Sequence, residues 1–563
     1  MVALLVFGAS FSNIISQQDA VHFALSWSLV NTHSAWLNGT MYSGQPYVTA
    51  SAGHLVSSLP PGLAYFGFAF VAPAPLILPM EPSVVAAYLA TYFACITGAL
   101  ACIAFYKVAR MFAGGRSSIL LSLVFVFGTS MWIYSRMYLP EGLATLLGIA
   151  SVYFLLRSFS FGLPARGEYS SAARRVAYPS LYLSGILLGL AIFVDNMSVF
   201  LVVPIAAYIA LRQRGSGGLG LLHQRRRSLP LAKLTIFILG LIVGSIPTWY
   251  YDAITTGSIF TAPYGNPIIG GVPSSAYESG LLQGLDRSIL SPQGGLLLFT
   301  PFLIVSAAGI IIAAIEKGLR RKLEEPAKKI GGDNNGSERL EQEEVETPRD
   351  ETSSAPLSLF VGLFLAVLIP FSLQSQFTYL HNTIGPAELV LAVPYALFPS
   401  LVVMEKIMKA GKSWWSMKVI IYALAILSML INGIIALTDP INQLAYLPAG
   451  AGGSVSNPFL TTNLPLFLGQ SYLTWWSFFQ HPAAYACAVL VFPIVVFFIY
   501  AFGASPVRGA QLGGGKVVEE VRLEPILRQR QQLGTTINPG EKQQKKQRQP
   551  LTMQDGRGAD VGK

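Results

Sequence analysis

Charge is scarce in this sequence. Asp, Glu, Lys and Arg together make up 12% of the 563 residues, about half the share found in soluble domains, whereas hydrophobic residues make up 52%. This composition excludes a soluble enzyme, a disordered protein and a fibrous repeat. Because a helical span takes about 20 apolar residues, we predict an all-α polytopic membrane protein with about 12 transmembrane helices.

Cysteine, intramembrane charge and repeats are also scarce. The three cysteines, Cys95, Cys102 and Cys487, all fall inside apolar runs, so we expect no disulfide framework and no Cys-based metal site. No two histidines have the spacing of a helical zinc motif. The apolar runs carry very few ionisable residues and show no internal repeat, which argues against an ion-coupled transporter built from inverted repeats.

Apolar runs predict the positions of the spans. They lie near residues 1–16, 83–105, 117–135, 140–157, 181–194, 196–211, 231–251, 294–315, 356–375, 386–404, 417–437 and 483–503. The fifth and sixth runs are separated only by Asp195 and its neighbours, which predicts a tight hairpin at the outer surface. A further apolar stretch, 60–79, opens with Pro-Pro-Gly, and we interpret it as an interfacial or re-entrant helix.

Lys and Arg indicate the orientation, because cytoplasmic loops of membrane proteins carry an excess of them. If the N-terminus lies inside, Arg136 and Arg287 are the only ones of the 38 basic residues in outer segments. This distribution predicts a multi-pass protein of the plasma membrane with both termini in the cytoplasm. The net charge of +10 then reflects the inner loops and the tail, and we expect no nucleic-acid partner.

The segments between spans differ by side of the membrane. We expect a transmembrane domain over 1–503 and a basic tail over 504–563. The tail and the inner loop 316–355 have too few apolar residues to offset their ordering entropy, so both are expected to be disordered and cytoplasmic. The outer loops are long, nearly uncharged and rich in Gly, Pro, Ser, Thr and Tyr, which favours a functional role. They cover 17–82, 252–293, 376–385 and 438–482.

Asp19 is the first candidate for chemistry. It follows directly after the first apolar run, where a carboxylate can deprotonate a hydroxyl or hold a divalent cation. The alternative is an interfacial charge that only ends a helix. His22 lies three residues further on and would share a helix face with Asp19. His54 lies in the same outer loop, although isolated histidines are more often hydrogen-bonded loop residues than ligands.

The two outer arginines are candidates for binding an anion. A guanidinium is a natural partner of a phosphate or a carboxylate. Arg136 lies just before Pro140-Glu141, so the alternative is a simple ion pair between Arg136 and Glu141. For Arg287 the alternative is a pair with Asp286 or Glu278.

Four segments, in order along the chain, resemble motifs of one family. They are Asp19; the segment Gly53 to Leu63 with Pro60-Pro61-Gly62; the segment Ser291 to Pro301, preceded by Tyr250-Tyr251-Asp252 and Thr256-Gly257-Ser258; and Gly385-Pro386 before Pro394. Their order resembles the GT-C superfamily of membrane glycosyltransferases, in particular the dolichyl-phosphate-mannose–protein mannosyltransferase-like and arabinosyltransferase-like members. The resemblance covers about residues 1–405.

The chain also departs from that family pattern. Ala387-Glu388 stands where the family has an Arg after Gly-Pro, and Ser58-Leu59 stands where a basic residue often precedes Pro-Pro-Gly. The usual second acidic residue of the first loop is not evident. If such cations bind the donor phosphate in relatives, this chain has Arg136 or Arg287 for the same task.

The resemblance implies a transferase of the cell envelope. A sugar carried on a polyprenyl phosphate would pass to a hydroxyl of a glycan, lipid or protein at the outer face. Asp19 is implied as the general base and an outer Arg as the group that stabilises the leaving phosphate, while His22, His54 and Glu141 are kept as substrate-binding candidates. Some members use a divalent metal such as Mg or Mn, but no ligand set here demands one.

Two other functions stay open at this point. One is a transporter or flippase of lipid-linked or neutral substrates, which would need no charged residue in mid-span. The other is a non-catalytic GT-C-like membrane subunit, which the missing family cations favour.

Overall fold

The computed structural model describes residues 2–10, 14, 16–37, 48–51, 53–76, 81–160, 171–214, 228–259, 281–291, 295–330, 354–374, 387–410, 414–438 and 464–465. The chain divides into two units, Met1–Phe492 and Pro493–Lys563, and every described residue belongs to the first. The predicted span 483–503, the tail 504–563, the outer loop 376–385 and nearly all of the loop 438–482 lie outside the described residues.

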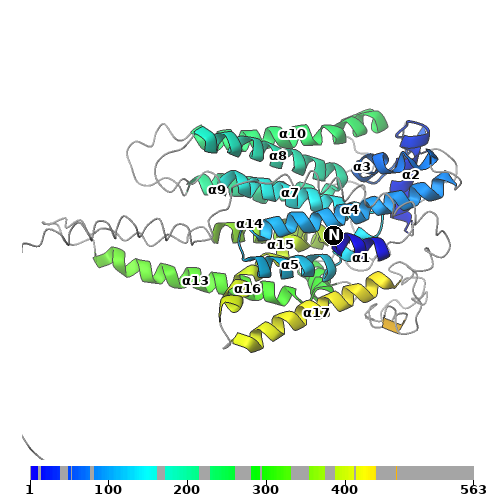
Figure 1. The fold of residues 1–563 in the computed structure, drawn as a ribbon. Coiled ribbons are helices and arrows are strands. Elements are labelled where there is room, and N and C mark those ends of the chain that lie inside the picture. The colour runs from blue at the N-terminus through cyan, green and yellow to red at the C-terminus, as the bar shows by residue number, and fades with distance from the viewer. Residues whose placement is uncertain are drawn as a thin grey trace, which may run out of the picture. The chain divides into compact units, whose positions relative to one another are not determined.

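Helices dominate the described residues (Figure 1). The α-helices are α1 (Val2–Ser10), α2 (Gln17–Asn31), α3 (Gly62–Val71), α4 (Pro82–Ala109), α5 (Gly115–Phe127), α6 (Met131–Ser135), α7 (Pro140–Ser160), α8 (Ser171–Val194), α9 (Val202–Arg214), α10 (Ser228–Thr256), α11 (Leu281–Ile289), α12 (Leu296–Phe299), α13 (Leu303–Ile330), α14 (Ser354–Gln374), α15 (Val393–Leu397), α16 (Ser400–Lys409) and α17 (Trp415–Leu437). Three short 3₁₀ helices are η2 (Ala74–Leu76), η3 (Asn196–Leu201) and η8 (Ala387–Leu391).

Six helices in the described ranges are long and apolar enough to cross a membrane. These stretches are Pro82–Ala109, Pro140–Phe159, Ala177–Val194, Leu231–Thr256, Pro356–Leu373 and Trp415–Leu437. Each matches a predicted run, and together they make the chain a helical membrane protein. The count of about 12 spans is not confirmed. The other predicted runs within the described ranges form helices that are shorter, interrupted or more charged.

α10, α8, α7 and α4 lie side by side in that order (Figure 1). α8 and α10 meet through two pairs of glycines, each pair spaced four residues apart: Gly185 and Gly189, and Gly240 and Gly244. A Cβ on Gly240 would lie 2.2 Å from the carbonyl oxygen of Tyr182, and one on Gly185 would lie 2.2 Å from that of Phe237. The two backbones are therefore in direct contact, as in other membrane helix pairs that use small residues.

The predicted span 117–135 is interrupted. α5 ends at Phe127, and Gly128 to Ser130 separate it from the short α6. The hydroxyl of Thr129 donates to the carbonyl of Phe125 at 2.6 Å and accepts from the amide of Met131 at 3.2 Å, so it replaces helical backbone bonds at this point. The 13 residues of α5 extend about 20 Å, too short for a complete span.

Other predicted boundaries also differ. The run 294–315 breaks between α12 and α13, and the run 386–404 breaks into η8, α15 and α16. Pro301 and Pro399 lie at these breaks, where a proline lacks the N–H that a continuous helix needs. The first run contributes only the nine residues of α1. The boundary between the fifth and sixth runs lies where it was predicted, since Asp195 alone separates α8 from η3. A hairpin at the outer surface stays a prediction.

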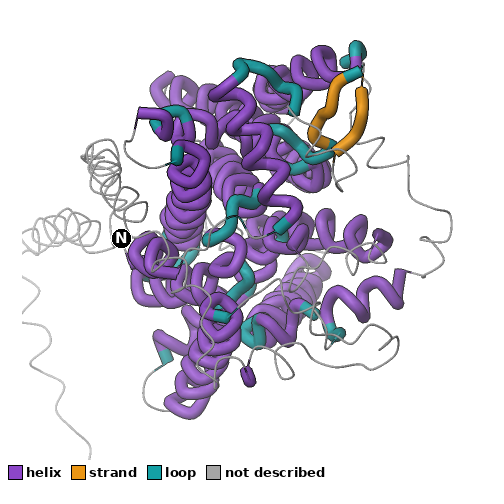
Figure 2. The backbone as a smooth tube through the Cα atoms, turned by 90° about the vertical axis from the view of Figure 1, so that its right-hand side faces the viewer, coloured by secondary structure: helices purple, strands orange, loops and turns teal. Residues whose placement is uncertain are grey.

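The inner loop begins later than predicted. α13 continues to Ile330, although a disordered loop was expected from residue 316. Its last part is rich in Leu, Glu, Lys and Arg, which are good helix formers. The all-α prediction also needs one correction. Strands β1 (Val48–Ser51) and β2 (His54–Ser57) form an antiparallel hairpin in the first outer loop (Figure 2).

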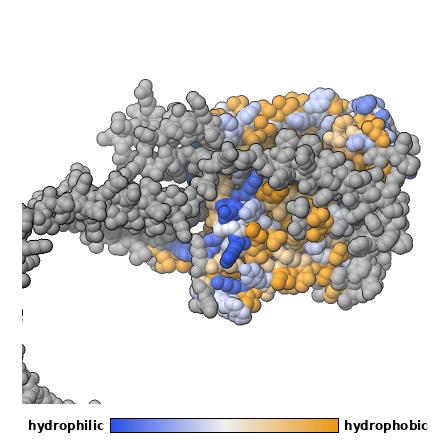
Figure 3. Space-filling view, in the orientation of Figure 1, coloured by the Kyte–Doolittle hydropathy of each residue, from blue (hydrophilic) through white to orange (hydrophobic). Residues whose placement is uncertain are grey.

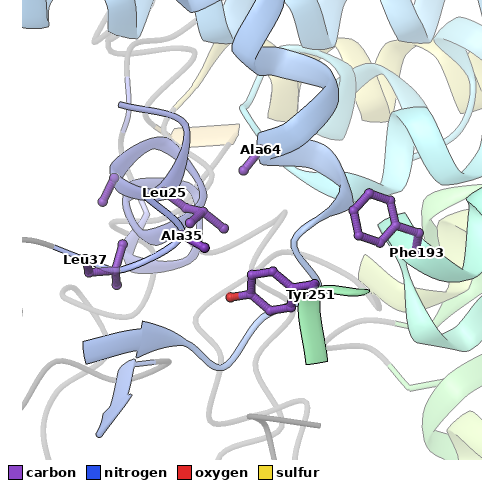
Figure 4. Packing of buried hydrophobic residues seen from close by; sticks show 7 residues of the cluster. Leu25, Ala35, Leu37, Ala64, Phe193 and Tyr251 are labelled. Atoms are coloured by element: carbon purple, nitrogen blue, oxygen red, sulfur yellow. The ribbon is translucent and has the colours of Figure 1, made fainter. Parts of the chain in front are cut away.

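The described part of the segment 17–82, which was predicted to be the first outer loop, is packed onto the helix ends and does not project from them. Leu25 of α2, Leu37 and Ala64 of α3 are buried in one cluster with Phe193 of α8 and Tyr251 of α10 (Figure 4). The hairpin is attached to the same place, because the hydroxyl of Ser51 donates to the carbonyl of Thr255 at 2.6 Å. α2 and α3 therefore form a cap over the ends of α8 and α10.

The long helices carry large apolar side chains on faces that no other described element covers. Large apolar areas are visible on the described surface in Figure 3. Exposed apolar side chains on one face of α10 are Ile238, Leu239, Ile242, Val243 and Ile246. Such a continuous apolar face fits contact with lipid.

Candidate functional site

Asp19 lies in the first turn of α2 and is completely buried. Its Oδ1 accepts a hydrogen bond from the Ser16 amide at 2.6 Å, and the Ser16 hydroxyl accepts one from the Asp19 amide at 3.0 Å. This reciprocal pair is a capping box, which starts the helix at this point. The negative charge also favours the positive N-terminal end of α2.

A stripe of polar side chains runs along α2. Asp19, His22 and Ser26 lie at i, i+3 and i+7, which places them on one face, and none of them is exposed. We call these three residues the α2 polar stripe. Neither ring nitrogen of His22 has a hydrogen-bond partner among the described residues. Burying polar groups without partners is costly, so this stripe is not explained by packing alone.

Tyr138 connects the α2 polar stripe to the rest of the bundle. Its hydroxyl lies 2.7 Å from the hydroxyl of Ser26 and donates to the carbonyl of Leu63 in α3 at 3.2 Å. A Cβ on Gly67 of α3 would lie 2.0 Å from the same hydroxyl, so only glycine fits there. Burial raises the pKa of Tyr138, so the phenol stays protonated and available as a donor.

Arg136 is buried among the helices, and its predicted place on the outer side of the membrane stays a prediction. Its guanidinium donates to the carbonyl of Ala436 near the end of α17. The preceding residue, Ser135, packs against Gly98, which lies 16 residues along α4, about 24 Å from the start of that helix. The early end of α5 explains this depth, because the chain turns back before it reaches the level where α4 begins.

The other predicted residues lie on three different elements. Glu141 is buried in the first turn of α7, where an acidic side chain suits the positive helix end. His54 is exposed on β2, and its ring stacks on Trp36 with ring centroids 4.5 Å apart. Arg287 belongs to α11, which packs on α14, but its side chain lies outside the described part. The structure thus joins Asp19 with His22 on one face, while His54 and Arg287 belong to other elements.

Two carboxylates were not predicted as site residues. Asp195 caps η3 by accepting from the Met197 amide at 3.0 Å, and burial raises the pKa of its carboxyl to about 6. Asp252 of α10 is also buried, and its Oδ1 has no partner among the described residues. Since Gly244 packs on Ile186 and the helices are parallel, both carboxylates lie at the same level of the α8–α10 pair. The sequence marked Asp195 only as a turn and Asp252 only as part of a motif.

The described residues do not form a metal centre. No group of three or more His, Cys, Asp or Glu side chains in the described ranges is arranged to hold a metal ion.

The burial of His22 predicts acid lability. Burial lowers the pKa of His22 to about 3 from its ordinary 6.5, so the imidazole is neutral in the folded protein. The unfolded chain takes up this proton below pH 6.5 and the folded chain does not, so stability is complete above 6.5 and falls towards pH 3. The expected slope is about 1.4 kcal/mol for each unit of pH.

Thermal unfolding of the purified protein between pH 7 and pH 4 measures this slope. His22→Gln, which cannot titrate, is expected to flatten it. Equal slopes for the wild type and His22→Gln would contradict the assignment.

The fold and the site define a multi-pass helical membrane protein with a buried polar stripe on α2. No protein-family model matches the chain, and no curated protein matches it. Among solved structures it is similar to ArnT from Cupriavidus metallidurans bound to undecaprenyl phosphate, at 12% identity and a TM-score of 0.42, over 84% of this chain and 75% of that one.

Two structures from Archaeoglobus fulgidus are similar to a comparable degree. The oligosaccharyltransferase tethered to an acceptor peptide matches at 13% identity and a TM-score of 0.43, over 77% of this chain and 54% of that one. AglB in complex with an inhibitory peptide and a dolichol-phosphate matches at 12% identity and a TM-score of 0.42, over 80% and 58%. The chain thus spans little more than half the length of these archaeal enzymes.

Proposed function

We propose that this protein is a membrane glycosyltransferase with a GT-C-like architecture. It would move a sugar from a polyprenyl-phosphate-linked donor to an acceptor hydroxyl at the outer face of the membrane. The observation that carries the proposal is the complete burial of the α2 polar stripe, with Asp19 at its first position. A polar stripe buried in a chain with so few ionisable groups in its spans is a mark of function. The order of the motifs in the sequence supports the same class.

The chemistry assigned to Asp19 is proton acceptance. The acceptor oxygen attacks the anomeric carbon, the bond from that carbon to the phosphate oxygen breaks, and the polyprenyl phosphate leaves with the electron pair. The hydroxyl proton passes to the Asp19 carboxylate. The Ser16 amide holds one carboxylate oxygen by a hydrogen bond of 2.6 Å, which fixes the orientation of the group. His22, neutral and buried one turn further along, can hydrogen-bond the substrate through either ring nitrogen.

The leaving phosphate needs a cation, because its negative charge grows as the bond breaks. Arg136 is our first candidate, since its guanidinium is buried and Tyr138, two residues further on, contacts the α2 polar stripe. A buried guanidinium stabilises an anion more strongly than an exposed one. Arg287 remains the second candidate.

A deletion strain tests the function. We expect a surface glycan to be lost on deletion and restored by the gene, while the unused lipid-linked sugar accumulates, as measured by mass spectrometry. A lipid extract of the deletion strain then serves as donor, and a cell-envelope extract of the same strain as acceptor, for the purified protein in detergent. A transferase consumes that donor without any membrane separating two compartments, whereas a transporter has nothing to transport. Loss of the glycan in cells without donor consumption in detergent would favour a transporter or a non-catalytic subunit instead.

A further inference from the structure

A second group of charges lies at the other end of the helices. Lys233 is near the start of α10, 18 residues before Tyr251. This separation is about 27 Å along the helix, so Lys233 is far from the buried cluster to which Tyr251 belongs. Its Nζ lies 4.8 Å from the centre of the Phe159 ring in α7. The guanidinium carbon of Arg212 in α9 lies 5.2 Å from the centre of the same ring. Three helices therefore bring two cations to one aromatic ring.

Few described groups offset the positive charges of Arg212 and Lys233. Arg212 donates to the hydroxyl of Tyr208, and the Tyr208 ring packs edge-on against Phe159. Neither Arg212 nor Lys233 forms an ion pair with a carboxylate among the described residues. A guanidinium has five N–H donors, and among the described residues Arg212 uses one of them on Tyr208. The others are available to a ligand. Both side chains are only partly exposed.

Repulsion between these cations makes the site suited to an anion. One ring cannot neutralise two like charges, and partial burial strengthens their repulsion. The N-terminus of α10 begins at Ser228, and the positive end of a helix adds to the same field.

An ion pair between α13 and α16 provides a comparison for these two cations. Lys406 of α16 forms an ion pair with Glu316 of α13, so that cation has its carboxylate within the protein. The described partner of Lys406 is a carboxylate, whereas Arg212 and Lys233 both contact the Phe159 ring.

We propose that Arg212, Lys233 and Phe159 form a binding site for a phosphate group at the inner membrane surface. The forked guanidinium of Arg212 would hold two phosphate oxygens and the ammonium of Lys233 a third. The phosphate belongs either to the headgroup of an anionic lipid or to a soluble phosphate ester. The site is separate from the α2 polar stripe and does not depend on the proposed transferase activity.

Binding can be measured on the full-length protein in detergent by native mass spectrometry. The probes are phosphatidylglycerol, zwitterionic phosphatidylcholine and inorganic phosphate. We expect phosphatidylglycerol to bind more tightly than phosphatidylcholine, and each of Arg212→Gln and Lys233→Gln to weaken it about fivefold. Lys406→Gln is the matched control, because it removes a cation that is already paired with Glu316, and it is expected to leave binding unchanged.

The outcomes separate the sources of the phosphate. If inorganic phosphate displaces phosphatidylglycerol, the phosphate group alone is the ligand. If it does not displace the lipid, the lipid headgroup is the ligand. Equal binding of phosphatidylglycerol and phosphatidylcholine with no binding of inorganic phosphate would overturn the proposal. So would variants at Arg212 and Lys233 that bind as the Lys406→Gln control does. If Arg212→Gln fails to elute as a single species, Lys233→Gln decides alone. The described contact of the Lys233 ammonium is with the face of the Phe159 ring, so this variant should fold.

Discussion

Changing Asp19 to Asn is expected to lower sugar transfer by about a hundred- to ten-thousand-fold, the range that a general base contributes. The amide of Asn cannot accept the acceptor's proton, but its carbonyl oxygen can still accept the Ser16 amide hydrogen bond that Oδ1 accepts now. The start of α2 should therefore survive the change, and the loss should appear in the rate and not in the amount of folded protein. Donor consumption by the purified protein in detergent measures the rate.

Ser16→Ala is the control for this substitution. It removes the hydroxyl that accepts from the Asp19 amide and so breaks the other half of the capping box, at a cost of about 1 kcal/mol of stability. The carboxylate itself is retained, so the transfer rate should stay close to that of the wild type. If Asp19→Asn and Ser16→Ala lower transfer equally, Asp19 acts only as a helix cap. If Asp19→Asn transfers sugar at the wild-type rate, another base must be sought, and Asp195 and Asp252 come next.

Changing Gly240 to Val is expected to separate α8 from α10. The new Cβ would lie 2.2 Å from the carbonyl oxygen of Tyr182, and backbone atoms cannot move aside as a flexible side chain can. We expect a loss of about 3 kcal/mol, the upper end of the usual range for over-packing. The temperature at which half of the protein leaves the monodisperse peak in size-exclusion chromatography measures the effect.

Gly318→Ala provides the comparison. Gly318 also lies inside a helix, α13, but nothing lies within 4 Å of the position a Cβ would take. Alanine there should stabilise the helix by about 0.5–1 kcal/mol, because glycine loses more backbone freedom on folding. A Gly240→Val protein as heat-resistant as the wild type would show that the glycine contacts between α8 and α10 do not hold these helices together.

The long helices were predictable from the sequence because hydropathy is a local property. α4, α7 and α10 each coincide with an apolar run, and lipid rewards such a run wherever it occurs. The interruption between α5 and α6 was not predictable in the same way. Gly128 lies within an apolar run, and only the hydrogen bonds of Thr129 and the packing of Ser135 on Gly98 show that the chain turns there.

The candidate site was predictable in part. The spacing of Asp19 and His22 was sufficient to place both on one helix face, and α2 has that face buried. Their burial was not predictable, because it depends on Tyr138 and α3, which come from distant parts of the sequence. The same reason explains the burial of Arg136. A count of charges by segment cannot show that its side chain is enclosed, whereas the fold brings α17 from a distant part of the sequence against it.

The hydrogen bond between Ser26 and Tyr138 joins residues 112 positions apart, which has a consequence for the order of synthesis. A ribosome adds roughly 5–20 residues each second, so α2 emerges about 6–20 s before the tyrosine that holds it. During that interval the polar stripe must stay hydrated outside the membrane or be held by the translocation machinery. The cap of α2 and α3 can close only after α8 and α10 have been made, because its buried cluster includes Phe193 and Tyr251. The first loop is therefore one of the last parts of this half of the protein to reach its final position.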